Sequence, residues 1–185
     1  MSDLVVAIDA GTQSIRAALV DLSGQIVALE KVTITPYVSP KQGWAEQDGQ
    51  YYWDKLCEAT NRVLAGVDPA RLGAVSLSTQ RQTVLPVDTD GIPLRPAIVW
   101  MDERRADAAK TGTGLLLGAS RLSGAHDVLK FAIEYSRANW LRQHEPEIWD
   151  RTHKFLFLSG FFTHRLTGEF VESTANVFGP WPFDV

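Results

Sequence analysis

The sequence is short of cysteine and of long apolar runs, and each shortage removes a class of protein. Among 185 residues Cys57 is the single cysteine, which excludes an internal disulfide and a cysteine-rich metal site and predicts a buried, unreactive thiol. The longest apolar window, FLFLSGFF at 155–162, falls well below the roughly 20 residues of a membrane helix. No basic segment followed by a long apolar run stands near the N-terminus, so we expect no secretory signal, no membrane partner and a cytoplasmic location.

A strong excess of charge is also missing. Lysine and arginine number 18 against 22 aspartates and glutamates, a net charge of −4, so no nucleic-acid partner is expected. The four histidines have no metal-ligand spacing with each other or with carboxylates. What remains is ordinary globular composition, with 45% hydrophobic and 22% charged residues.

Apolar runs and turn residues predict an α/β fold with strands first and helices later. Short connections favour an antiparallel meander for the first three strands. Spacing of apolar residues predicts the first helix, and turn residues predict a later hairpin around Asp88–Gly91. The expected elements of this half are strands at 4–8, 14–20 and 25–35, a helix ending at Gly66, and a buried strand at 72–78.

The second half is predicted to be mainly helical. We expect a short polar helix at 102–110, a glycine-rich loop with one helical turn at 111–126, helices at 130–144 and 147–149 broken by Pro146, and a helix at 158–166 closed by Gly168. The last residues hold two prolines and large aromatics and do not resemble the end of a finished domain. Apolar surface near Phe178, Trp181 and Phe183 makes self-association into a homo-oligomer an expectation.

The first candidate site is the turn between the first two strands. Asp9 ends an apolar run, and Gly11-Thr12-Gln13-Ser14 follows at once, with Arg16 two residues further on. Backbone N–H groups and small hydroxyls in such a turn can meet phosphate oxygens, and a carboxylate at a strand end can hold Mg²⁺. Phosphoryl transfer needs these parts, although a plain hairpin with a polar turn remains an alternative at this point.

Two stretches resemble a known family. AIDAGTQSIRAALVD, at 7–21, is similar to the first phosphate motif of the actin, hexokinase and heat-shock-chaperone ATPase superfamily. LSTQRQTVLPVDTDGIPLRPAIVWMDERRA, at 77–106, resembles the sugar-contacting strand and hairpin of the FGGY carbohydrate kinases. GWAEQDGQYYWD and RLTGEFVESTANVFG match further segments of that family in the right order. The resemblance covers essentially the whole chain.

The resemblance implies roles for particular residues. ATP phosphates would be served by Gly11, Thr12, Ser14 and Arg16, with Asp9 as the Mg²⁺-associated carboxylate. The sugar-contacting residues would be Arg81 and Gln82, through hydrogen bonds to hydroxyls, and Trp100, as an apolar wall. Taken alone, Trp100 is more often a core aromatic and Arg81 an ion-pair partner. Asp102 is expected to be a turn or cap residue close enough to Trp100 to shape the site.

The implied fold is a truncated ribonuclease-H-like, actin-like ATPase lobe with an antiparallel or mixed sheet flanked by helices, spanning residues 1–185. The family's general-base aspartate would lie downstream, so we expect no catalytic base here and a missing C-terminal kinase lobe as partner. The implied activity is ATP-dependent phosphorylation of a sugar, polyol or sugar acid. Gln82 differs from the residue of either the glycerol-kinase or the xylulokinase branch, which leaves the sugar open. A non-catalytic sugar-binding half-kinase is one alternative, and an ATPase acting on protein partners is another.

Overall fold

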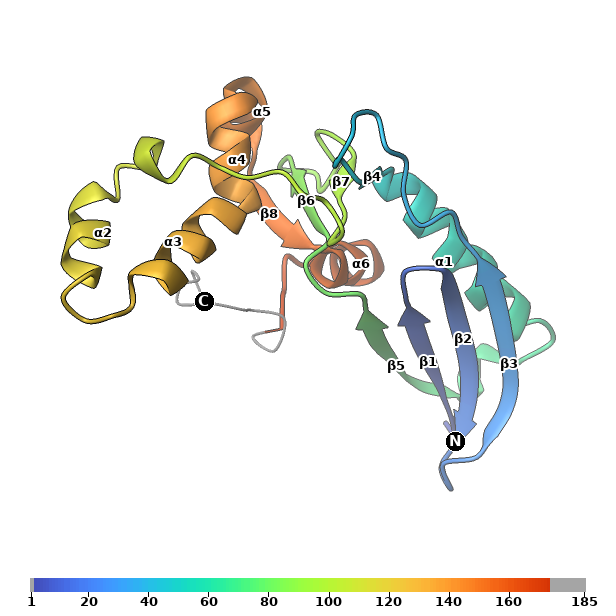
Figure 1. Cartoon of the computed structure of the whole chain (residues 1–185). Helices are drawn as coiled ribbons and strands as arrows, with labels where there is room; N and C mark the ends of the chain where they lie inside the picture. Colours follow the sequence, from blue (N-terminus) through green and yellow to red (C-terminus); the bar gives the residue numbers. More distant parts are fainter. Residues whose placement is uncertain (1, 174–185) are drawn as a thin grey trace.

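The computed structural model describes residues 2–173, which form two β-sheets and six α-helices (Figure 1). The first sheet has the order β3-β2-β1-β5, with strands β1 (Leu4–Ala10), β2 (Ser14–Asp21), β3 (Ile26–Thr33) and β5 (Leu72–Thr79). β1 to β3 form the expected antiparallel meander, while β1 and β5 run parallel. The expected mixed sheet flanked by helices is therefore confirmed. The apolar surface expected near Phe178, Trp181 and Phe183 lies outside the described residues.

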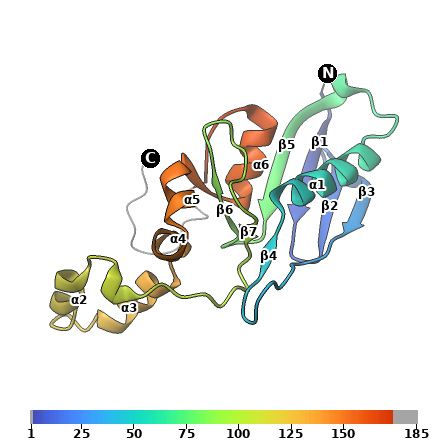
Figure 2. The same ribbon diagram turned by 90° about the horizontal axis from the view of Figure 1, so that it is seen from above.

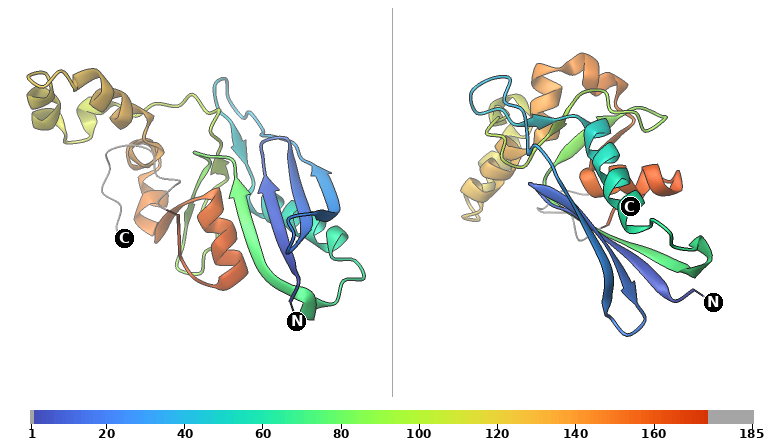
Figure 3. Two further views of the ribbon diagram at one scale, coloured as in Figure 1. Left: turned by 90° about the horizontal axis from the view of Figure 1, so that it is seen from below. Right: turned by 90° about the vertical axis from the view of Figure 1, so that its right-hand side faces the viewer.

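Helix α1 (Gly49–Val63) covers one face of this sheet (Figures 1 and 3). It begins after Asp48, whose side chain accepts hydrogen bonds from the backbone N–H groups of Gln50 and Tyr51, as a helix N-cap does. Tyr52 and Leu56 face the sheet and are buried in the same core as residues of β1, β2 and the last helix. Burial of this apolar stripe is the main source of the helix's stability.

The strand predicted at 72–78 forms, but the prediction that it is buried is wrong. β5 forms there, but residues 73–76 are exposed and Val75 keeps 56% of its surface accessible. β5 is the edge of the sheet among residues 2–173, so few neighbours cover its side chains. An apolar run of this length has the same appearance in a central strand and in an edge strand.

The second sheet is small and antiparallel, with the order β4-β7-β6-β8. Its strands are β4 (Glu46–Gln47), β6 (Val84–Val87), β7 (Ala97–Ile98) and β8 (Lys154–Phe157). The expected turn at Asp88–Gly91 is present, since Gly91 N–H donates to Asp88 O at 3.1 Å. This sheet stands between the first sheet and the helical region at 114–151 (Figure 2).

The helices of the second half differ in part from the expectation. They are α2 (Gly114–Ser120), α3 (His126–Tyr135), α4 (Arg137–His144), α5 (Pro146–Arg151) and α6 (Leu158–Thr167), preceded by a 3₁₀ turn at Ala108–Lys110; the first half has another 3₁₀ turn, at Pro69–Arg71. The prediction of a polar helix at 102–110 is wrong except for the 3₁₀ turn at Ala108–Lys110. The segment expected to be a glycine-rich loop with one helical turn contains the whole of α2. The expected helix 130–144 is divided at Ser136. Pro146 was expected to separate two helices, but it is itself the first residue of α5, because proline fits the first turn of a helix.

Helices α2 and α3 project away from both sheets (Figures 2 and 3). Across residues 2–173 no helix combines the length and the apolar character that crossing a membrane requires.

Candidate functional site

Three segments that are distant in sequence meet at the turn after β1. The Thr12 hydroxyl donates to Gln80 Oε1 at 3.2 Å and accepts from the Trp100 indole Nε1–H at 3.1 Å. Thr12 belongs to the expected phosphate turn, Gln80 precedes the expected sugar-contacting pair, and Trp100 is the expected apolar wall. The structure therefore brings both halves of the predicted site into direct contact.

The phosphate turn offers two free backbone donors. Gly11 N–H is used inside the turn, since it donates to Ser14 O at 3.0 Å, and Ser14 is buried. In the part of the chain that the structure describes, nothing accepts from the N–H groups of Thr12 and Gln13. These two groups can meet an anion, so the predicted turn chemistry rests on Thr12 and Gln13 more than on Gly11.

Two cations lie side by side next to this turn. Arg16 on β2 stands opposite Lys31 on β3, and opposite Asp9 on β1. Arg16 Nη1 pairs with Asp9 Oδ2 at 2.9 Å, with both side chains about half exposed. Lys31, which the sequence reading did not single out, has no ion pair among residues 2–173. Like charges directly opposite on neighbouring strands repel, and an anion between them removes the repulsion.

These groups line one shallow depression of about 280 Å³, formed by Gly11, Thr12, Gln13, Ser14, Arg16 and Lys31. The exposed Asp9–Arg16 pair contributes only about 0–1 kcal/mol, so a bound polyanion can compete for Arg16. The described residues contain no cluster of three or more His, Cys, Asp or Glu side chains that could hold a metal. The Asp9 carboxylate suits Mg²⁺ that keeps its waters and binds phosphate oxygens, because Mg²⁺ is usually held by few carboxylates.

The expected sugar side is open to solvent. Trp100 is 46% exposed, which is unlike a core aromatic. Arg81 is exposed, and its guanidinium makes no ion pair or hydrogen bond with residues 2–173, which is unlike a surface ion-pair partner. Gln82 has a backbone φ of 60°, the only positive φ of a residue other than glycine in the described chain. Such a conformation costs roughly 1–2 kcal/mol and clusters at functional sites.

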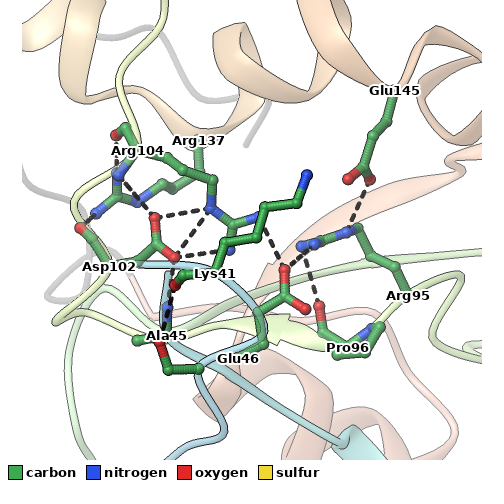
Figure 4. Close-up of polar contacts among 10 residues, drawn as sticks. Lys41, Ala45, Glu46, Arg95, Pro96, Asp102, Arg104, Arg137 and Glu145 are labelled. Atoms are coloured by element: carbon green, nitrogen blue, oxygen red, sulfur yellow. Dashed lines mark hydrogen bonds and ion pairs between the residues drawn. The ribbon is translucent and has the colours of Figure 1, made fainter. Parts of the chain in front are cut away.

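Two residues after Trp100, Asp102 is the centre of a buried ion network (Figure 4). Asp102 N–H donates to Val99 O at 2.9 Å, which closes a turn around Trp100. The Asp102 carboxylate accepts from Ala45 N–H at 2.7 Å and from two guanidinium nitrogens of Arg104 at 2.7 and 2.8 Å. Asp102 was expected to be a turn or cap residue, and it does close a turn, while its carboxylate is also the centre of a buried network.

The network continues outward from Arg104. This guanidinium lies over the rings of Trp44 and Trp140, at 4.0 and 4.6 Å from their centroids, and the two rings contact each other edge to face. Its Nη1 also reaches Glu46 Oε1 at 2.8 Å. The remaining members are Arg95, which pairs with Glu46 and Glu145, and Arg137, which donates to the backbone carbonyls of Asp102 and Arg104.

Charge compensation sets the ionisation inside this network. Burial by itself would raise the pKa of Asp102, but hydrogen bonds from Arg104 and Ala45 outweigh it and hold that pKa below its ordinary value. Burial lowers the pKa of Arg137, although Asp102 opposes that shift. Away from the site, burial raises the pKa of the Cys57 thiol, which is only partly covered, so the thiol stays protonated as an unreactive cysteine does.

Known proteins resemble the chain along nearly its whole length. Residues 4–181 match the model of the FGGY family of carbohydrate kinases, N-terminal domain. A glycerol kinase of Thermococcus gammatolerans is 31% identical over 193 residues, covering 95% of this chain and 36% of the relative. A xylulose kinase of Streptomyces coelicolor is 33% identical over 180 residues, covering 95% and 36%. In the crystal structure of xylulose kinase from Rhodospirillum rubrum, 91% of this chain aligns with 35% of that one, at a TM-score of 0.71 and 24% identity.

Proposed function

The chain belongs to the FGGY family of carbohydrate kinases, and on that premise we propose that it supplies the sugar-binding side and the first phosphate motif of an ATP-dependent kinase for a sugar, polyol or sugar acid. The chain spans about a third of the length of its relatives, so the activity proposed is that of the larger enzyme. The observation that carries the proposal is the contact of Thr12 with both Gln80 and Trp100.

The nucleotide side follows from charge. Two cations, Arg16 and Lys31, and the free N–H groups of Thr12 and Gln13 surround the depression described above. These groups suit a polyphosphate, because charged donors and backbone amides hold phosphate oxygens by charge-assisted hydrogen bonds. Bound Mg²⁺ would neutralise charge that develops on the transferred phosphoryl group, with Asp9 as its carboxylate.

The sugar side follows from three exposed groups, of which Trp100 is held in place by Thr12. The Arg81 fork can donate to several hydroxyls, and the Gln82 amide can donate and accept. The open face of Trp100 can cover the C–H groups of a carbon chain. A glycerol kinase and a xylulose kinase are almost equally identical in sequence to this chain, at 31% and 33%, so the choice of sugar stays open.

The test measures ADP release and binding with the 185-residue chain. MgATP is supplied with a panel of ketoses, polyols and sugar acids, and calorimetry follows each sugar separately. ADP release stimulated by one sugar supports a kinase and names the substrate. Sugar binding without ADP release is also expected when the catalytic base lies downstream, so the same panel is then run on a chain extended downstream. Sugar binding by the extended chain, still without ADP release, supports the second candidate, a non-catalytic sugar-binding half-kinase. Absence of both sugar and nucleotide binding contradicts both proposals.

Single variants separate the two sides of the site. Lys31→Gln should weaken MgADP binding about threefold to tenfold at low salt and leave sugar binding unchanged, because an exposed charge acts on the phosphates alone. Lys154→Gln on β8 is the matched control, since Lys154 is also an exposed strand lysine without an ion pair among residues 2–173. Arg81→Met should weaken sugar binding without changing MgADP binding. Equal effects of Lys31→Gln and Lys154→Gln would contradict the phosphate assignment.

A further inference from the structure

A continuous row of hydrogen bonds runs from Trp100 through the site into the core. Trp100 Nε1–H donates to Thr12 Oγ1 at 3.1 Å, and Thr12 contacts Gln80 Oε1 at 3.2 Å. Gln80 Nε2 donates to Tyr52 Oη at 3.0 Å, and Tyr52 donates to Pro36 O at 3.4 Å. The row therefore joins a solvent-exposed ring to a tyrosine that is completely buried.

The two ends fix the direction of every bond between them. An indole N–H can only donate, and a backbone carbonyl can only accept. Tyr52 gives its single proton to Pro36 O and must accept from Gln80, so the amide nitrogen of Gln80 faces Tyr52. The amide oxygen then faces Thr12, and the single hydroxyl proton of Thr12 is committed to it.

Thr12 consequently presents only a lone pair to the site. It accepts from Trp100 and donates to Gln80, which leaves one acceptor position and no proton. Phosphate oxygens at neutral pH mainly accept hydrogen bonds, so they do not match this hydroxyl. An O–H donor matches it, and the backbone N–H groups of Thr12 and Gln13 remain for phosphate.

Gln80 is well placed to hold this arrangement. Its backbone N–H donates to Ala10 O at 2.9 Å, which continues the pairing of β1 with β5 beyond Thr79. Its side chain is half-buried between Thr12 and Tyr52. Because Tyr52 is buried in the core, it fixes the orientation of the Gln80 amide whether or not a ligand is bound.

We propose that Gln80 is a positioning residue that fixes the Thr12 hydroxyl as a hydrogen-bond acceptor for an O–H donor, either a sugar hydroxyl or a metal-bound water. The identity of the ligand rests on the function proposed above, whereas the orientation of the row does not. Gln80 acts through Thr12 and touches neither ligand.

The first test needs no ligand and uses the indole N–H signal of Trp100 in the ¹⁵N-labelled 185-residue chain. Tyr52→Phe removes the acceptor that orients the Gln80 amide, so the amide can turn and donate to Thr12. We expect an upfield shift of the indole proton and at least threefold faster hydrogen exchange, as in Gln80→Leu. Thr12→Val should give the largest change, and Thr12→Ser should restore the parent signal.

Tyr51→Phe is the matched control, because the Tyr51 hydroxyl accepts from Thr35 N–H at 2.9 Å and takes no part in the row. The proposal is overturned if Tyr52→Phe and Tyr51→Phe move the indole signal equally, or if neither moves it. Since Thr12→Ser keeps the hydroxyl, its failure to restore the signal would also count against the assignment.

The second test identifies the donor with separate titrations of the parent chain. A shift of the Trp100 indole on adding glycerol, xylulose or gluconate alone assigns a sugar hydroxyl. A shift with MgADP, absent with ADP and EDTA, assigns a metal-bound water. Ligand binding detected elsewhere in the spectrum without any indole shift overturns the acceptor role, whereas no binding of any ligand is the failure of the proposed function and leaves the first test to decide about Gln80.

Discussion

Replacing Asp102 by asparagine should destabilise the chain by about 3–5 kcal/mol, the usual result of removing one partner from a buried ion pair. The Asp102 side chain is fully buried and accepts from Ala45 N–H, from Arg104 N–H and from the Arg104 guanidinium. Asparagine keeps one oxygen but turns an N–H₂ group toward these donors. It also leaves Glu46 as the one carboxylate among residues 2–173 that is paired with Arg104, and it removes the negative charge that Arg104 and Arg137 share.

Urea unfolding at pH 7, followed by far-ultraviolet circular dichroism and tryptophan fluorescence, measures this change. In a separate thermal unfolding experiment, the midpoint of Asp102→Asn should lie roughly 6–20 °C below that of the parent chain. Glu103→Gln is the control, because the neighbouring Glu103 is exposed, and its effect should stay within about 0.5 kcal/mol. If Asp102→Asn lies within about 1 kcal/mol of the parent, the network contributes no more than a surface pair and the reasoning is refuted.

The same variant gives a pH signature with a defined sign. The pKa of Asp102 lies below its ordinary value of 3.8, so the carboxylate stabilises the fold above about pH 4. That contribution is lost as pH falls through the folded-state pKa. The difference in unfolding free energy between parent and Asp102→Asn should therefore narrow below about pH 4, and a constant difference down to pH 2 would contradict the assignment.

Two further predictions concern stability near the site. Burial raises the pKa of Tyr52 to about 12, so this tyrosine ionises at lower pH in the unfolded chain than in the folded one. The free energy of unfolding should therefore fall by up to about 2.7 kcal/mol as pH rises from about 10 to 12. In urea titrations Tyr52→Phe should remove that loss and Tyr51→Phe should keep it. Gln82→Gly should be about 1 kcal/mol more stable than Gln82→Ala, the reverse of the usual order, because φ at this residue is 60°. Unfolding in urea compares the two, and greater stability of the alanine variant would show that the positive φ carries no strain.

The first half of the fold was predictable because its signals are local. Short turns and alternating apolar residues identify β1 to β3, and Asp48 with the apolar spacing identifies α1. The polar helix expected at 102–110 failed because Asp102 and Arg104 bind partners such as Ala45 and Glu46, more than 50 positions away in sequence. Such long-range pairing overrides local helix propensity and cannot be read from the segment itself.

The starts of α4 and α5 both have local sequence signals. Ser136 accepts from Asn139 N–H at 3.3 Å and starts α4 as its N-cap, and Pro146 stands at the first position of α5. Serine and proline at these places begin helices as readily as they interrupt them. Lys31 was missed at the site for another reason, since only the register of β2 against β3 places it opposite Arg16.

Trp100 is a candidate site residue because it is held in place, not because it is exposed. Single exposed aromatic residues are common on protein surfaces, so an exposure of 46% distinguishes Trp100 from a core residue but does not by itself indicate a binding site. What distinguishes Trp100 is that both of its ends are held: the indole N–H by Thr12, and the backbone by a turn that Asp102 closes. A ring that is fixed at both ends and open on its face loses little further freedom when a ligand covers it, which lowers the entropic cost of binding. The neutral row through Gln80 and the ionic network through Asp102 share no residue, so loss of either one should leave the other end of Trp100 in place.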